Sequence, residues 1–118
     1  MTDRYIDSNH RMSQAIVHGN TVYLAGQVAS DASADMRGQT EQILQGIEQL
    51  LAKAGTDKQH LLSATIWVTD MAEFAEMNLA WDAWVADCLP PVRACVESKL
   101  AKPEWKVEIM VIAALPGA

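Results

Sequence analysis

The sequence predicts a two-layer α+β domain in which two helices cover one face of a mixed β-sheet. Five short segments alternate apolar and polar residues as strands do, and two longer segments repeat apolar residues every three or four positions as helices do. Their order is strand, strand, helix, strand, helix, strand, strand. Strand–helix–strand connections favour parallel pairs and the two hairpins favour antiparallel pairs. The length of 118 residues suits one compact domain, residues 1–118.

The first two strands are expected at residues 13–18 and 21–28, and the Gly-Asn pair at residues 19–20 suits the turn of a hairpin. Gly26 falls on the face of the second strand that carries Leu24. A glycine at such a position indicates either a bulge or the close approach of another backbone or a ligand.

The first helix is expected at residues 34–54, where apolar residues recur at helical spacing. Ser33 is the expected N-cap and Gly55 the expected C-terminal stop. A strand at residues 61–69 follows, and its alternation places Trp67 on the face opposite its larger aliphatic residues.

Asp70 is expected to cap the second helix, with Glu73 three residues on as its capping-box partner. The Pro-Pro pair at residues 90–91 ends this helix, because proline cannot donate a helical hydrogen bond. Two strands, at residues 93–100 and 106–114, close the chain as a hairpin. The apolar stripe of the helix comprises Phe74, Met77, Trp81, Trp84, Val85 and Cys88.

With both helices on one side, the second face of the sheet has no cover from this chain. We expect that face to carry Trp67, Thr65 and Tyr23. An uncovered sheet face with a tryptophan on it indicates oligomerisation.

Charge and composition argue against several classes of partner. The formal net charge of −6 argues against binding nucleic acid or an anionic membrane, because such surfaces need clustered lysine and arginine. No apolar run approaches the roughly 20 residues of a membrane span, and residues 1–5 do not resemble a signal peptide. The two cysteines form no recognisable disulfide or zinc pattern, so we expect reduced thiols in the cytoplasm.

Several common catalytic motifs are missing. The sequence contains no nucleophile elbow, glycine-rich phosphate loop, dinucleotide fingerprint or metal-ligand spacing, so we expect neither a metal nor a cofactor. His10, His18 and His60 lie near turns or the terminus without an evident partner, which argues against a catalytic histidine. Cys95 lies in a predicted strand, where a cysteine is more often a small buried apolar residue than a nucleophile.

Arg93 and Glu108 are unusual for their surroundings, because each lies at or within an apolar strand. A carboxylate there is costly to bury without a partner. One interpretation places Glu108 on a solvated face or pairs it with Arg93 in a structural ion pair. The other makes Glu108 a base beside a guanidinium that binds a substrate carboxylate with a forked pair of hydrogen bonds. The pattern alone leaves both open.

Five segments match the pattern of a known family, and they follow one another along the chain in the same order as in that family. The C-terminal pair is Pro-Val-Arg-Ala-Cys-Val-Glu at residues 91–97 and Lys-Val-Glu-Ile at residues 106–109. Upstream, residues 19–27, 39–44 and 70–78 are similar to the family's first glycine-containing strand and its two helices. The chain therefore resembles the RidA/YjgF family of reactive intermediate deaminases, and its aromatic-rich second helix resembles the YoaB-like branch.

The resemblance implies a chorismate-mutase-like α+β homotrimer with clefts between subunits. It also implies cofactor-free hydrolysis of 2-aminoacrylate and other 2-imino acids to 2-oxo acids and ammonia. By position, Arg93 would bind the substrate carboxylate and Glu108 would orient or activate the attacking water. The backbone at Cys95 would hydrogen-bond the imine nitrogen, and Asn78 and Gly26 would shape the cleft. An imine is already electrophilic, so positioning and one proton-handling carboxylate suffice.

Two other functions stay open at this point. A trimeric protein that binds 2-oxo acids without turnover would need Arg93 but not Glu108. An endoribonuclease activity, claimed for some relatives, fits the net charge of −6 poorly. Two residues also depart from the family pattern: Met12 stands where many RidA enzymes have a tyrosine, and Ala25 where they often have a small hydroxylated residue.

Overall fold

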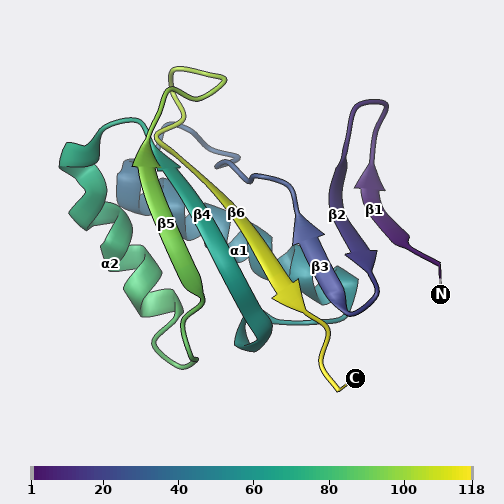
Figure 1. Ribbon diagram of the computed structural model, residues 1–118. Coiled ribbons are helices and arrows are strands. Elements are labelled where there is room, and N and C mark those ends of the chain that lie inside the picture. The colour runs from purple at the N-terminus through teal and green to yellow at the C-terminus, as the bar shows by residue number, and fades with distance from the viewer. Residues whose placement is uncertain (1, 118) are drawn as a thin grey trace.

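The computed structural model describes residues 2–117, and it forms a six-stranded mixed sheet with two helices packed on one face (Figure 1). The helices are α1 (Met36–Ala54) and α2 (Phe74–Trp84), and the short 3-10 turns are η1 (Lys58–His60) and η2 (Met71–Glu73). The strands are β1 (Arg4–Ser8), β2 (Ser13–His18), β3 (Thr21–Leu24), β4 (Leu61–Val68), β5 (Val92–Glu97) and β6 (Val107–Ala114). The predicted α+β fold class is confirmed.

The strands lie side by side in the order β1-β2-β3-β6-β4-β5. β4 and β5 are parallel and are connected through α2, as the strand–helix–strand pattern predicted, while all other neighbours are antiparallel. The predicted hairpin of the last two strands is wrong. β4 lies between β5 and β6, because residues 98–106 carry the chain past the end of β4 before β6 begins.

The ends of α1 combine one confirmed prediction with one correction. Asp35 is the N-cap, and its carboxylate accepts a hydrogen bond from the N–H of Gly38 at 2.8 Å. Ser33, the expected cap, instead donates to the carboxylate of Asp31. Gly55 ends the helix in a left-handed conformation with φ of 97°, which glycine adopts without steric cost.

The second helix is shorter than its apolar stripe predicted. Asp70 caps the η2 turn, and α2 then begins at Phe74 without a side-chain cap from Glu73, so the capping box does not form. The helix ends at Trp84, well before Cys88. The ammonium group of Lys58 donates to the carbonyl of Trp84 at 2.7 Å, which satisfies one of the carbonyls that every helix leaves unpaired at its C-terminus.

β1 was not predicted, because its mixed polar sequence shows little alternation. It pairs with β2, and the guanidinium of Arg4 donates to the carbonyls of Ala54 and Lys53 at 3.1 and 3.0 Å. These contacts bind the first strand to the C-terminal end of α1, where cations are favoured by the helix dipole.

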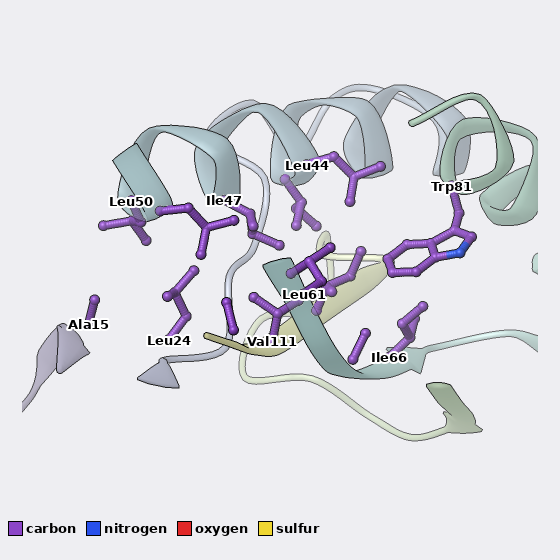
Figure 2. Packing of buried hydrophobic residues seen from close by; sticks show 14 of the residues in the cluster. Ala15, Leu24, Leu44, Ile47, Leu50, Leu61, Ile66, Trp81 and Val111 are labelled. Carbon is purple, nitrogen blue, oxygen red and sulfur yellow. The ribbon is translucent and has the colours of Figure 1, made fainter. Parts of the chain in front are cut away.

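The hydrophobic core fills the space between the helices and the sheet (Figure 2). β4 and β6 alternate buried and part-exposed residues, so each presents one face to the core and one away from it. The largest fully buried aliphatic side chains in the core include Ile43, Ile47, Leu51, Ile66 and Ile109.

Within residues 2–117 no helix is long and apolar enough to cross a membrane.

Candidate active site

Arg93 lies on the edge strand β5, on the sheet face that the helices cover. Its register partner is the buried Ala64 of β4. The guanidinium carbon lies 5.5 Å from the ring centroid of Trp81 and 5.7 Å from that of Phe74. Nη1 donates to Oδ1 of Asn78 at 2.8 Å. Three side chains of α2 therefore fix an exposed guanidinium by cation–π contact and one hydrogen bond, and its remaining N–H groups can bind an anion.

Cys95 lies two residues further along β5, on the same face as Arg93. Its register partner is Ile66, and its thiol is half-buried. Burial raises the pKa of the Cys95 thiol above its ordinary value, and the charge of Arg93 opposes this rise only in part. The thiol is therefore protonated at neutral pH, which argues against a thiolate nucleophile. Because β5 is an edge strand, some of its backbone N–H and C=O groups point away from β4 and can meet a ligand.

Glu108 lies on β6 in register with Trp67 of β4, on the face away from the helices. Its carboxylate lies directly against Gly26, where any Cβ would collide with it. The prediction for this glycine was a bulge or the close approach of another backbone or a ligand, whereas the group that lies against it is the side-chain carboxylate of Glu108. The backbones of Gln27 and Ile109 exchange hydrogen bonds of 2.8 and 3.1 Å, which hold the two segments together. β3 itself ends at Leu24, earlier than predicted.

Arg93 and Glu108 do not meet within one chain. They lie on strands separated by β4, and they point to opposite faces, because Arg93 pairs with Ala64 and Glu108 pairs with Trp67. Ala64 and Trp67 are three positions apart along β4, and residues an odd number of positions apart in a strand point to opposite faces of the sheet. Within one chain, therefore, Glu108 is neither beside the guanidinium of Arg93 nor in a structural ion pair with it, and both interpretations that bring the two together are wrong at this level.

The sheet face away from the helices, called here the open face, is largely apolar. Tyr23, Val96 and Val92 are 45%, 46% and 73% exposed there. Among the described residues that β3, β4, β5 and β6 present to this face, Glu108 is the one charged side chain. The face also carries Thr65, Trp67, Met110 and Ile112, in agreement with the predicted uncovered surface. Such a contiguous apolar surface marks an interaction site.

The apolar stripe of α2 contributes two residues to the site, although its pattern predicts only a place in the core. The rings of Phe74 and Trp81 also contact Arg93. The spacing of Phe74, Asn78 and Trp81 places all three on one helix face, and this was the signal that could have identified them. No group of three or more His, Cys, Asp or Glu side chains in residues 2–117 lies together as metal ligands would.

Comparison with known proteins gives consistent results over almost the whole chain. Residues 2–115 match the family model described as endoribonuclease L-PSP. The chain is 43% identical to the RutC family protein YoaB of Escherichia coli over 98% of this chain and 100% of the relative. It is 46% identical to a RutC family protein of Haemophilus ducreyi over 93% of this chain and 94% of the relative.

The fold agrees equally well with solved structures. A member of the YjgF protein family from Neisseria meningitidis superposes with a TM-score of 0.95 at 42% identity, over 100% of this chain and 98% of that one. A Pseudomonas aeruginosa protein superposes with a TM-score of 0.93 at 38% identity, over 97% and 99% of the two chains. By sequence and by fold, the chain belongs to the RidA/YjgF family, and among its relatives are the YoaB proteins.

Proposed function

We propose that this protein hydrolyses 2-aminoacrylate and related 2-imino acids to 2-oxo acids and ammonia, in the cytoplasm and without a cofactor. The observation that carries the proposal is the fixed guanidinium of Arg93. Asn78 and two aromatic rings hold it in place while it stays exposed, which suits a forked hydrogen bond to a small carboxylate. The matching carboxylate for proton transfer is Glu108, which lies against Gly26 without a salt-bridge partner among residues 2–117.

The proposed reaction needs only water and proton transfer. With the substrate carboxylate on Arg93, water attacks the imine carbon while Glu108 accepts a proton from that water. The C–N double bond becomes a single bond, and the proton is passed to the nitrogen. The carbinolamine then collapses: its hydroxyl proton moves to the nitrogen, the C–O bond becomes a double bond, and the C–N bond breaks to release the 2-oxo acid and ammonia. An enamine enters the same path once its β-carbon has gained a proton and its nitrogen has lost one to give the imine.

We propose that the active site forms between chains of a homotrimer. Arg93 and Glu108 point to opposite faces of one chain, so they can share a substrate only when the Arg93 edge of one subunit meets the open face of another. Each cleft would take Arg93, Asn78 and Cys95 from one subunit, with Glu108 and Gly26 from its neighbour. Packing the open faces together around a closed symmetry axis would also remove their apolar surface from water.

Trp67→Glu should break the trimer into smaller species. The change places a carboxylate on the open face next to Glu108, its register partner, so assembly would bury an unpaired charge beside a like charge. Light scattering at micromolar concentration measures the result. Gln49→Glu, an added charge on the exposed side of α1, is the matched control and should leave the trimer intact. A well-folded wild-type monomer in the same measurement would overturn the trimer proposal.

Cys95→Ala should keep turnover within about threefold of wild type, because a protonated thiol is a poor nucleophile and the proposal uses only the backbone at this residue. Steady-state kinetics on an imino acid measure this, and circular dichroism checks the fold. A loss of more than about tenfold in a folded variant would assign a chemical role to the thiol.

The proposal is tested by generating imino acids in situ with an amino-acid oxidase and following their loss. The wild type should accelerate the loss, and Arg93→Ala should not. If the wild type binds 2-oxo acids but leaves the rate of imine loss unchanged, the protein is a ligand-binding relative without turnover.

The endoribonuclease description of the family model receives no support from the charge of this chain, because a net charge of −6 repels an RNA backbone.

A further inference from the structure

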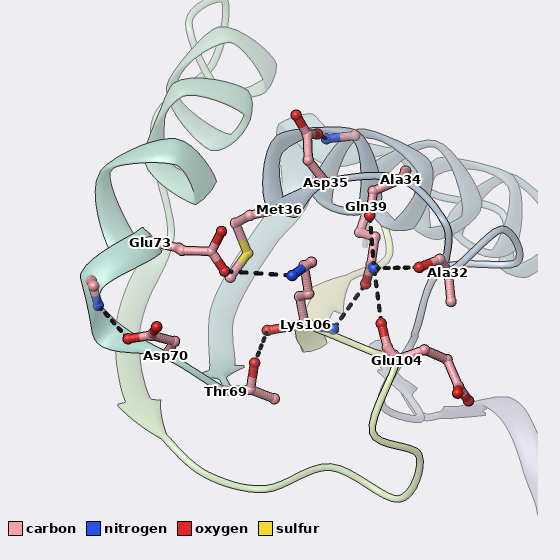
Figure 3. A network of polar contacts seen from close by, with 12 residues as sticks. Ala32, Ala34, Asp35, Met36, Gln39, Thr69, Asp70, Glu73, Glu104 and Lys106 are labelled. Carbon is pink, nitrogen blue, oxygen red and sulfur yellow. Dashed lines mark hydrogen bonds and ion pairs between the residues drawn. The ribbon is translucent and has the colours of Figure 1, made fainter.

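Gln39, in the first turns of α1, is a completely buried polar side chain at 0% exposure. Its amide nitrogen lies 3.1 Å from the carbonyl oxygens of Ala32 and Ala34. Both carbonyls belong to residues 25–35, the loop that leads from β3 into α1 (Figure 3). Gln39 therefore holds the end of that loop against the helix.

The same side chain also holds a second loop, which is distant in sequence. Its amide nitrogen lies 3.1 Å from the carbonyl oxygen of Glu104, and its amide oxygen accepts the N–H of Lys106 at 2.9 Å. Glu104 and Lys106 belong to residues 98–106, the loop that enters β6 (Figure 3). Glu108 is the second residue of β6. A buried amide whose nitrogen and oxygen are both hydrogen-bonded rigidifies what it joins.

The two loops that Gln39 joins lie next to the two residues that make up the carboxylate half of the site. Gly26 lies at the start of one loop, and Glu108 lies just after the end of the other. These two residues are in direct contact, and the hydrogen-bonded backbones of Gln27 and Ile109 lie next to them, so a shift of either loop is transmitted to the carboxylate. The Arg93 half depends on different contacts, because α2 holds it through Asn78 and two aromatic rings.

We propose that Gln39 is a positioning residue for Glu108, an inference that rests on the proposed function. By fixing both loops, Gln39 holds the carboxylate in the place where it takes a proton from the attacking water. A residue that served stability alone would affect both halves of the site equally. A positioning residue should instead alter proton transfer and leave carboxylate binding at Arg93 unchanged.

Gln39→Met fills the same space but can neither donate nor accept these hydrogen bonds. We expect a fall in kcat of at least about tenfold, with a shifted acidic limb of its pH profile. The Kd for pyruvate, the unreactive product of 2-aminoacrylate, should stay within about threefold of wild type because Arg93 is unaffected. Thr40→Val is the matched control. Thr40 is equally buried on the same helix, but its hydroxyl donates to the carbonyl of Met36 within α1, so neither quantity should change.

An unchanged kcat in folded, trimeric Gln39→Met would overturn the proposal, and so would parallel losses of kcat and pyruvate binding. If that variant does not fold, Gln39→Glu keeps the acceptor for Lys106 and, because burial keeps the carboxyl protonated, one donor in place of two, and the same comparison applies. Should the wild type show no imine hydrolysis, the proposed function fails separately. NMR titration of the Glu108 carboxyl then tests the positioning proposal by itself. A titration midpoint that shifts in Gln39→Met but not in Thr40→Val supports the proposal. Identical titrations in the wild type and both variants overturn it.

Discussion

Arg93→Lys should lower kcat/KM by roughly 10- to 100-fold although the positive charge is kept, which corresponds to about 1.4–3 kcal/mol of transition-state binding. The guanidinium carbon lies 5.5 and 5.7 Å from the centroids of two aromatic rings of α2, and one of the guanidinium nitrogens donates to Asn78 at 2.8 Å. Lysine can retain the cation–π contacts. It cannot donate to Asn78 and also offer a planar fork to both oxygens of a substrate carboxylate.

Steady-state kinetics on imino acids of different size measure this effect. Arg37→Lys is the matched control, because Arg37 is an exposed arginine of α1 that pairs with Glu41 of the same helix at 3.7 Å. It should change kcat/KM by less than about twofold, as expected for a surface ion pair. If Arg93→Ala behaved like the wild type on every imino acid tested, the substrate carboxylate would have to bind elsewhere.

Much of the fold follows from local patterns, which is why it could be predicted from the sequence. The hairpin turn at residues 19–20, the stop at Gly55 and the alternation of β4 each depend on neighbouring residues alone. Strand order does not. The insertion of β4 between β5 and β6 is decided by packing across the whole sheet, so an adjacent pair of terminal strands was wrongly interpreted as a hairpin.

The same limit applies to the site. The sequence identified Arg93 and Glu108 as unusual charged residues, and the structure explains Gly26 through the carboxylate that lies against it. Their relative position could not be predicted, because it depends on the register of both strands against β4. Gln39 was missed for a related reason. All of its partners are backbone groups of loops, and two of them are 65 and 67 residues away in sequence.

Glu108→Gln should reduce kcat by on the order of 100-fold or more, as is typical when general acid–base help is lost. Glutamine keeps the size and the hydrogen bonding of the side chain but not its basicity. Pyruvate should bind about as tightly as to the wild type, because Arg93 remains. Glu104→Gln, which changes an exposed carboxylate in the preceding loop, is the matched control and should retain activity. Surviving turnover in Glu108→Gln would mean that backbone groups polarise the water.

Mixing the inactive variants Arg93→Ala and Glu108→Gln should restore activity if each site takes one residue from each of two neighbouring subunits. Every mixed trimer then contains one intact site of three, and random mixing at equal amounts leaves about a quarter of all sites intact. The two chains can be co-expressed with different tags, so that mixed trimers are purified through both. If Arg93 and Glu108 of a single site came from one chain, no mixed trimer would contain an intact pair. We expect recovery, because Arg93 and Glu108 point to opposite faces of the same chain. Activity no higher than that of the separate variants would refute the shared site.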